Sequence, residues 1–472
     1  MNGLDATEIK LSNLEKNIRI DSKVYKKIYI KIDEDLKKHE YTLLGDQAEI
    51  MKKGIFDIKA ECYTDKGIPF VRIGNLKDMI IDDSDIIYIP ETENEKNFTT
   101  CLKKNDIILS KTAYAAASLV TLEECNTSQD TVAIKLKPNI NSYFLVAFLN
   151  SKYGYYQMER WFTGNIQMHL NLEDSKNIII PKLNLIFQKR IELIFKCALK
   201  IRNEIRNCYN SAERLLLEEL DLNINEFKGK NVAIKSFFSS FGVSGRLDSE
   251  YYNPKYDLLK EKIINNAKYV KSIKDIKISN HRGLQPRYSK NGELNVINSK
   301  HILKRGLDYE NFQKTDLINW DIQSKARVFK EDILTYTTGA NIGRTSIYMK
   351  EEKALASNHV NILRIRNENP YYIAFVLNSM VGKLQTEKLS VGSAQAELYP
   401  KDIDSFIIPF IDQDIQEKIK IKVIEAFGLQ NKFDKLLQIE KEAVEKAIEE
   451  NEDVAMEWIE FQLNKFNIKL EI

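Results

Sequence analysis

The stretch Tyr143–Ser151 reads YFLVAFLNS, and the stretch Tyr371–Ser379 reads YYIAFVLNS. The second stretch lies 228 residues after the first, and the same offset relates the pairs Gly164 and Gly392, Gln167 and Gln395, Leu170 and Leu398, Asp174 and Asp402, Pro181 and Pro409, and Gln188 and Gln416. Apolar runs alone can align by chance, but glycine, glutamine and proline recurring in one frame indicate an internal duplication. Each copy also begins with an Arg-x-Asp-Ser motif, at Arg19–Ser22 and Arg246–Ser249.

Both copies share one order of expected elements. Strand-like runs punctuated by glycine and asparagine come first, as at 67–73 and 332–336. A helical stretch follows, then a short apolar strand that ends at proline, and finally a long charged amphipathic segment. We therefore expect an α/β (α+β) fold with two repeated domains, each followed by a long helix. The expected boundaries are 1–183 for the first domain, 184–222 for the first helix, 223–233 for a linker, 234–410 for the second domain, 411–450 for the second helix and 451–472 for a C-terminal tail.

The first long segment carries apolar residues at alternating spacings of three and four, which is typical of a coiled-coil seam. The expected seam residues are Ile191, Ile194, Ala198, Ile201, Ile205, Cys208, Ala212 and Leu215 in the first helix, and Ile419, Val423, Ala426, Leu429, Phe433 and Leu436 in the second. Because each helix needs an apolar partner and each supplies one, we expect an antiparallel coiled coil with pseudo-two-fold symmetry. The alternative is that each helix packs on its own domain.

Composition bounds the class of protein. With 43% hydrophobic residues, 9 prolines and 18 glycines, the 472 residues are typical of a globular protein of several domains. No signal-peptide pattern and no membrane-spanning apolar run is present, so we expect a cytoplasmic protein. The net charge is only +2, so nucleic-acid binding would depend on local basic surfaces such as the stretch from Arg282 to Arg305. The cysteines form no CxxC pair, which indicates reduced thiols: Cys62, Cys101, Cys125, Cys197 and Cys208.

Catalytic motifs are not found in the sequence. It contains neither the Asn/Asp-Pro-Pro-Tyr/Phe tetrapeptide of amino-methyltransferases nor a glycine-rich turn for S-adenosylmethionine. Gly339–Thr345 looks like a phosphate loop, but it has three residues between its glycines and Arg344 in place of lysine. The histidines lie far apart, without the spacing of a metal site: His39, His169, His281, His301 and His359. We expect no catalysis, cofactor or metal in this chain.

The doubled pattern resembles the specificity (S) subunit of type I restriction–modification systems. The resemblance rests on Gly339–Gly343, on Gly392 with Gln395 and Leu398, on Pro409 with Gln416–Ile419, and on their first-half counterparts. The Arg-x-Asp-Ser motifs are also similar to the start of target-recognition domains in some type IIG enzymes. One departure concerns the first copy, where Ala113–Ala117 replaces Gly339–Gly343, so the same loop geometry is not assumed there.

The resemblance implies separate roles for the domains, the helices and the partner subunits. Each domain would be a target-recognition domain that reads one half of a split, asymmetric DNA site. The helices would separate the domains and dock two copies of an adenine-N6 methyltransferase subunit, which would bind S-adenosylmethionine. Added restriction subunits would use ATP and Mg²⁺ to drive cleavage. A helix of about 35 residues at ~1.5 Å each spans roughly 50 Å, or about 15 base pairs. This length suits a spacer that sets the distance between the two recognition domains, which we call the ruler.

Base-reading residues are expected among polar and basic side chains in turn-rich segments, where they can enter a groove. In the first domain the candidates are Arg72, Asn75, Lys77, Lys111, Tyr114, Gln167 and His169. In the second domain they are Arg282, Gln285, Arg287, Tyr288, Ser299, Lys300, His301, Thr338, Asn341, Arg344 and Gln395. Each of these could instead contact a phosphate or be an ordinary surface residue.

Two other classes of function stay open on the sequence alone. One is the specificity portion of a type IIG or IIB-like restriction–methylation enzyme, or a divergent nuclease. The other is a coiled-coil scaffold of an antiviral defence complex that does not read DNA.

Overall fold

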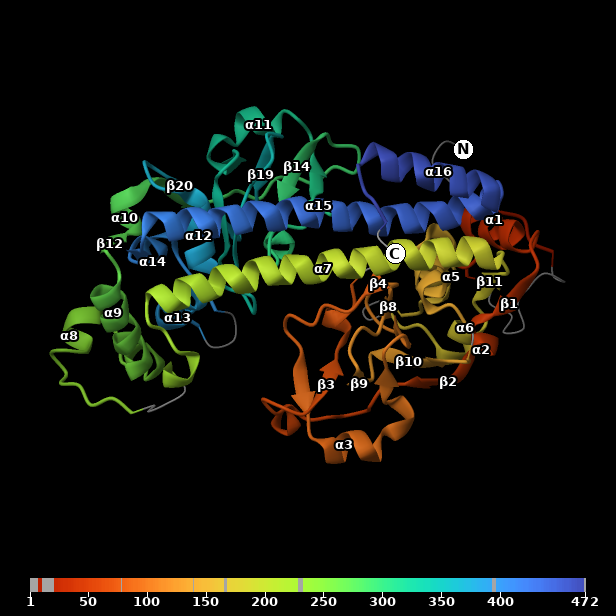
Figure 1. Ribbon diagram of the computed structural model, residues 1–472, viewed down its shortest axis with the longest axis horizontal. Helices are drawn as coiled ribbons and strands as arrows, with labels where there is room; N and C mark the ends of the chain where they lie inside the picture. The colour runs from red at the N-terminus through yellow and green to blue at the C-terminus, as the bar shows by residue number, and fades with distance from the viewer. Residues whose placement is uncertain are drawn as a thin grey trace. The chain divides into compact units, whose positions relative to one another are not determined.

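The computed structural model describes residues 7–10, 21–77, 79–138, 140–164, 168–227, 232–392 and 396–470. The chain forms two compact units, Met1–Arg202 with Asn431–Ile472, and Asn203–Gln430. The division falls inside two long helices, α7 (Leu185–Glu219) and α15 (Gln413–Glu449), which run through the ribbon of Figure 1 in yellow-green and blue. Each unit therefore contains one α/β domain and one half of each long helix.

The first domain has two main sheets within its described residues, with strand orders β2-β10-β7-β8-β4 and β5-β3-β9-β6, and a ribbon of β1 with β11. Its strands are β1 (Tyr41–Leu43), β2 (Ala48–Lys53), β3 (Ile68–Val71), β4 (Met79–Ile80), β5 (Ile87–Ile89), β6 (Leu102–Lys103), β7 (Ile107–Ser110), β8 (Ala117–Leu119), β9 (Glu124–Thr127), β10 (Thr131–Leu136) and β11 (Ile179–Pro181). Its helices are α1 (Lys27–Leu36), α2 (Leu44–Gln47), η2 (Ala60–Cys62), η3 (Ile73–Asn75), α3 (Glu91–Lys96), η4 (Phe98–Thr100), α4 (Ser142–Asn150), α5 (Lys152–Trp161) and α6 (Leu172–Lys176).

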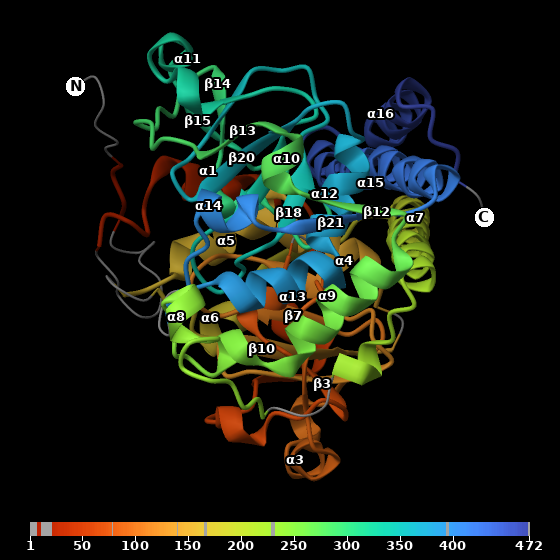
Figure 2. The ribbon, with the colours of Figure 1, turned by 90° about the vertical axis from the view of Figure 1, so that its left-hand side faces the viewer.

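The second domain repeats this topology with the orders β13-β20-β17-β18 and β15-β14-β19-β16, and a ribbon of β12 with β21. Its strands are β12 (Tyr269–Ser272), β13 (Lys277–Arg282), β14 (Leu294–Ile297), β15 (Gln313–Thr315), β16 (Arg327–Val328), β17 (Ile333–Tyr336), β18 (Thr345–Ile347), β19 (Ala354–Ala356), β20 (Val360–Ile365) and β21 (Ile407–Phe410). Its helices are η5 (Ile224–Phe227), α8 (Phe241–Ser244), η6 (Glu250–Tyr252), α9 (Pro254–Asn266), α10 (Ile273–Ile276), η7 (Ser299–His301), α11 (Asn319–Ile322), η8 (Ser324–Ala326), α12 (Pro370–Asn378), α13 (Met380–Leu389) and α14 (Pro400–Asp404). In Figure 2, α9 lies beside α13, and an ion pair between Lys255 and Glu387 at 3.0 Å joins them.

The duplication is visible in individual hydrogen bonds. The Gln157 amide donates to the Ile179 carbonyl at 3.0 Å and accepts the Ile179 N–H at 2.8 Å. The Gln385 amide does the same at Ile407, at 3.0 and 2.7 Å. A glutamine on the helix thus satisfies both backbone groups of the first residue of β11 and of β21. The expectation of two repeated α/β domains is confirmed.

The long helices are buried along much of the expected seam. In α7, the residues from Ile191 to Ala212 that were expected in the seam are all buried. Leu215 is only half-buried, however, and Leu216 takes its place in the core. An α-helix with 3.6 residues per turn drifts from a strict heptad, which moves the buried face by one residue. In α15, Ile419, Val423, Ala426 and Leu436 are buried, whereas Leu429 and Phe433 are half-buried.

Within the second unit, the C-terminal half of α7 and the N-terminal half of α15 contribute to one hydrophobic core. Ala212 and Leu216 belong to the same cluster as Ile419 and Val423. This cluster also contains Tyr372 of α12, so within the second unit both long helices pack on the domain as well. In the second unit, the long helices therefore pack both on the domain, as in the alternative, and on each other.

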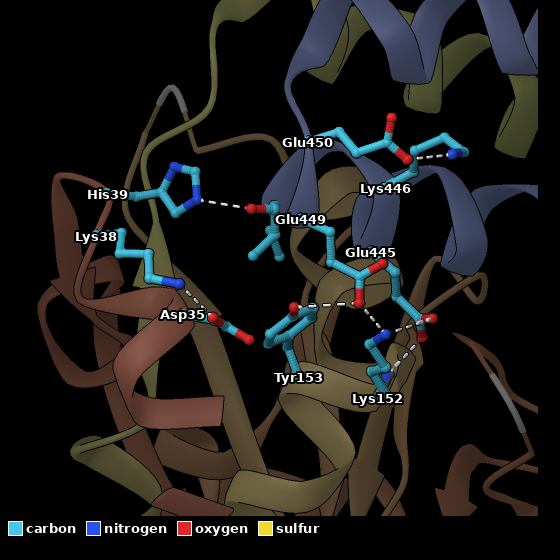
Figure 3. Close-up of polar contacts among 10 residues, drawn as sticks. Asp35, Lys38, His39, Lys152, Tyr153, Glu445, Lys446, Glu449 and Glu450 are labelled. Atoms are coloured by element: carbon cyan, nitrogen blue, oxygen red, sulfur yellow. Dashed lines mark hydrogen bonds and ion pairs between the residues drawn. The ribbon is translucent and has the colours of Figure 1, made fainter. Parts of the chain in front are cut away.

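Within the first unit, the C-terminal half of α15 is attached to the domain by polar contacts (Figure 3). The backbone N–H of Lys152, at the start of α5, donates to the Glu445 carboxylate at 2.6 Å. The Lys152 ammonium pairs with Glu449, and the His39 ring donates to the Ile448 carbonyl at 2.9 Å. Glu445 thereby caps a helix from another element.

The segment after α15, expected as a tail, forms the helix α16 (Glu452–Lys465). Asn451 caps this helix by accepting the N–H of Val454 at 3.0 Å. Arg190 of α7 pairs with Glu460, so α16 is part of the first unit. Within the described residues, no helix is both long and apolar enough to cross a membrane.

Candidate nucleic-acid interface

Each domain brings together two loops that are distant in the sequence. In the first domain, the segment after α5 folds back on itself through paired hydrogen bonds between Thr163 and His169, at 2.9 and 2.7 Å. The next residue, Leu170, donates its N–H to the carbonyl of Lys111, which follows β7, at 2.7 Å. Thr112 also bridges to His169. The candidates Lys111, Tyr114 and His169 therefore belong to one surface region.

The second domain builds the same region with different side chains. Val391 and Glu397 exchange hydrogen bonds at 3.0 and 2.8 Å, and the N–H of Leu398 donates to the Thr337 carbonyl at 3.0 Å. Thr338 also bridges to Glu397. Glu397 is the positional counterpart of His169, and Thr337 that of Lys111. We call the two regions the first and second loop pairs.

The loop pairs also share one unusual backbone position. Ala113 has a φ of 66° and donates its N–H to the Met168 carbonyl at 3.3 Å. Gly339 has a φ of 108° and donates to the Ala396 carbonyl at 2.8 Å. The first copy thus keeps this turn although its glycine is lost, at a conformational cost of roughly 1 kcal/mol for an alanine in the left-handed region.

The predicted site residues differ widely in exposure. Those that expose their side chains are Arg72, Lys77, Tyr114, Gln285, Arg287, Tyr288, Lys300 and Asn341. Those that are half-buried are Lys111, His169, Arg282, Ser299 and Arg344. Those that are buried are Asn75, His301 and Thr338. Gln167 and Gln395 lie outside the described residues.

Asn75 and His301 prove to be equivalent, and both are structural. Each closes a one-turn 3₁₀ helix, η3 or η7, by accepting the backbone N–H three residues before it. The Asn75 side chain accepts from Arg72 at 3.0 Å, and the His301 ring Nδ1 accepts from Asn298 at 2.9 Å. The exposed fractions of 5% and 1% leave neither side chain a surface for a base. Both base-reading assignments are therefore corrected.

The neutral state of His301 follows from its surroundings. Because Nδ1 accepts a hydrogen bond, the proton of the neutral ring lies on the buried Nε2. Burial, and then the charge of Lys300, lowers the pKa of His301 to about 4. The ring also packs against Phe312 with centroids 5.4 Å apart.

Other candidates serve the shape of the loops. The Tyr114 hydroxyl lies 2.8 Å from the Ile73 carbonyl oxygen and 3.0 Å from that of Leu76, and its single proton is donated to one or shared between them, which holds η3 against the first loop pair. The Arg282 guanidinium donates to the Leu398 carbonyl at 3.0 Å and lies over the Tyr399 ring at 5.1 Å. These contacts position the loops and leave part of each side chain at the surface.

Arg287 is the candidate that best fits a direct reader. Its side chain is exposed and makes no hydrogen bond to another described residue, so its guanidinium is available to a ligand. Its backbone is fixed, because its carbonyl accepts the Thr315 hydroxyl at 2.7 Å. The neighbouring Tyr288 hydroxyl donates to Asn298 at 2.8 Å, which ties this segment to η7.

The structure also identifies a basic residue that the sequence reasoning missed. Lys53 ends β2 as Arg282 ends β13, and each is followed by a glycine, Gly54 or Gly283. The signal in the sequence is the basic residue–glycine pair, but it recurs at an offset of 229 rather than 228 residues.

Across the described residues, no group of three or more histidine, cysteine, aspartate or glutamate side chains could hold a metal ion.

The chain is similar to a protein family and to several solved structures. Residues 37–208 and 265–449 match the family model described as type I restriction modification DNA specificity domain. No curated protein matches the sequence significantly. Among solved structures, the S subunit of a type I restriction–modification system from M. genitalium is similar, at 13% identity and a TM-score of 0.33, over 91% of this chain and 96% of that one.

Two further solved structures show weaker likeness. The HsdS subunit from Thermoanaerobacter tengcongensis has 13% identity and a TM-score of 0.28, over 87% of this chain and 97% of that one. The type IIG restriction endonuclease BpuSI has 9% identity and a TM-score of 0.28, over 39% of this chain and 29% of that one. The family assignment rests on the family model, which covers both halves and most of the sequence. The chain belongs to the family of type I restriction–modification DNA specificity domains.

Proposed function

We propose that this chain is the DNA-sequence specificity subunit of a type I restriction–modification complex. Each α/β domain is a target-recognition domain that reads one half of a bipartite, asymmetric DNA site. The chain itself is non-catalytic and acts in the cytoplasm with its partners. Two adenine-N6 methyltransferase subunits bind S-adenosylmethionine and transfer the methyl group, and restriction subunits use ATP and Mg²⁺.

The observation that carries this proposal is that each domain contains an equivalent loop pair. Their backbone hydrogen bonds are the same in the two domains, whereas the side chains that they present differ. His169, for example, stands where the second domain has Glu397. The two loop pairs share one backbone structure but carry different polar side chains. This difference suits two half-sites of different sequence, because side-chain donors and acceptors determine which base edges are bound.

The long helices suit the role of a spacer. α7 has 35 residues and α15 has 37. At ~1.5 Å per residue, such helices extend over roughly 50 Å, which corresponds to about 15 base pairs. We propose that they form the antiparallel coiled coil with pseudo-two-fold symmetry, so that helix length sets the unread spacer and domain sequence sets the half-sites.

The test is a reconstitution of the chain with the adenine methyltransferase encoded in the same genome. The proposal predicts that the pair binds duplex DNA in a salt-dependent manner and methylates adenine, whereas neither polypeptide alone methylates a specific site. Purified chain that binds S-adenosylmethionine by itself would favour a type IIG-like enzyme instead. A reconstituted complex that does not bind DNA would favour a scaffold.

A further inference from the structure

The ends of β2 and β13 occupy the same place in the two domains. Lys53 is the last residue of β2 and lies next to the central strand β10, and Arg282 is the last residue of β13 and lies next to β20. The following glycine donates its N–H to the first carbonyl of that central strand, at 3.1 Å for Gly54 and 2.9 Å for Gly283. The two domains therefore place a cation at one equivalent position.

The glycine after each cation is required by close packing. A Cβ on Gly54 would lie 2.2 Å from the Ser128 carbonyl oxygen, and a Cβ on Gly283 would lie 2.0 Å from the Ala356 carbonyl oxygen. Neither distance leaves room for a side chain, so the backbone passes against the neighbouring strand at this point. This close packing fixes the backbone position of the preceding basic residue, Lys53 or Arg282.

In the first domain, a second lysine lies on the same face. Lys53 is opposite Val132 of β10, and Val132 is opposite Leu109 of β7. Directly opposed residues of an antiparallel sheet project to the same face, and so does the residue two positions further along a strand. Lys111 directly follows β7, two positions after Leu109, and its N–H donates to the Asp130 carbonyl at 2.9 Å, so the pairing continues to it and places it on the face of Lys53. The pKa of Lys111 is lowered by burial and then by the charge of Lys53, as expected for neighbouring ammonium groups.

This pair of positive charges is poorly compensated. Lys53 is exposed, and within the described residues the Lys111 ammonium makes one long hydrogen bond of 3.5 Å, to the Gln129 carbonyl. Asp130 is the acidic group whose charge acts on Lys111. Over the part of the chain that the structure describes, neither lysine forms an ion pair. Lys111 also belongs to the first loop pair, since its carbonyl accepts the N–H of Leu170.

We propose that Lys53 and Lys111 form a phosphate-binding site that positions a DNA strand on the first recognition domain, with Arg282 as the counterpart of Lys53 in the second. This inference rests on the proposed function. A phosphodiester between the two ammonium groups removes their repulsion and adds charge-assisted hydrogen bonds. Because every nucleotide carries the same phosphate, this site contributes affinity and register rather than sequence preference.

The two domains grip DNA differently at this position. The second domain has Thr337 in place of Lys111, and its Arg282 is held by the Leu398 carbonyl and the Tyr399 ring. It therefore offers one fixed guanidinium where the first domain offers two ammonium groups. A planar guanidinium makes directed hydrogen bonds, whereas the ammonium group of a flexible lysine acts as a point charge.

The experiment uses the full chain in complex with its methyltransferase and compares the variants K53A and K111A with the matched control K52A. Lys52 is exposed on the same strand but projects to the opposite face, because side chains alternate along a strand. Binding is measured over a range of salt concentrations to a duplex that carries the methylated site and to an unrelated duplex. Each test variant should weaken binding to both duplexes and lower the slope of log K against log salt by about 0.9, whereas K52A should change neither.

The outcomes separate this site from the proposed function. Wild-type binding with an unchanged slope in K53A, or an equal loss in K52A, would overturn the lysine site alone. A change in the methylated sequence in K53A would also overturn it, because that result would indicate a base contact. A wild-type complex that binds neither duplex would refute the proposed function itself.

Discussion

His301 should make the stability of the second unit depend on pH in a way that one substitution removes. In the folded chain the pKa of His301 is about 4, whereas an unfolded histidine has a pKa of about 6.5. Between these values the unfolded chain binds the extra proton and the folded chain does not, so the unfolding free energy falls as the pH falls. The loss begins below about pH 6.5 and is complete near pH 4. At about 1.36 kcal/mol per pKa unit, it amounts to roughly 3 kcal/mol.

The matched variant is His301→Asn, which copies the side chain that Asn75 supplies at the equivalent position of the first domain. Asparagine keeps an acceptor for the N–H of Asn298 but does not titrate. The variant loses the ring contact with Phe312, so its overall stability should fall by about 1 kcal/mol at pH 7.5. Between pH 7.5 and pH 4.5, however, it should lose roughly 3 kcal/mol less than the wild type.

The assay is chemical denaturation of the full chain at several pH values, with hydrogen exchange at the Asn298 amide to locate the transition. His359→Asn serves as the control, because His359 lies in the same unit and is exposed. Parallel pH dependence in the wild type and in His301→Asn would show that His301 is not held neutral, and would refute this account of η7.

Three further predictions concern reading, spacing and the helix core. Arg287→Ala should cost about 1–3 kcal/mol of discrimination at one half-site only; equal loss of methylation at both half-sites would contradict base reading. Removing four residues, about one helical turn, between Ala198 and Cys208 of α7 should shorten the unread spacer and leave both half-sites unchanged, and methylation mapping that shows an unchanged spacer would reject the ruler. Glu440 of α15 is fully buried, and neither of its carboxylate oxygens has a hydrogen-bond partner among the described residues. Burial raises its pKa well above the ordinary value, so the folded chain retains a proton that the unfolded chain loses, and stability falls as pH rises above about 4.5. Glu440→Leu should therefore raise the melting temperature more at pH 8 than at pH 5, with the unpaired group costing about 1–3 kcal/mol, whereas a pH-independent gain would show that the carboxyl does not titrate as expected.

The duplication and its α/β elements could be predicted because the marker residues from Tyr143 onward keep a single offset of 228. Upstream of that point the offset varies: His301 follows Asn75 by 226 residues, and Arg282 follows Lys53 by 229. Insertions and deletions in loops leave the hydrogen-bond register intact but break the sequence frame. For this reason Lys53 was missed, although its counterpart Arg282 was identified.

The incorrect site assignments have a different physical cause. Asn75 and His301 lie in polar, turn-rich segments, which indicate a surface. Both side chains instead turn inward to accept a backbone N–H that burial would otherwise leave unsatisfied. A turn-capping role of this kind depends on tertiary burial, which local composition does not encode. The shift of the seam from Leu215 to Leu216 likewise depends on the true helical period.

The most direct test of the central claim is a genome-wide map of methylated adenines in cells that carry the methyltransferase, with and without this chain. Two equivalent domains with different side chains predict a bipartite, asymmetric motif with a spacer of fixed length, present only when the chain is expressed. A single uninterrupted motif, or a methylation pattern that does not depend on the chain, would contradict the account.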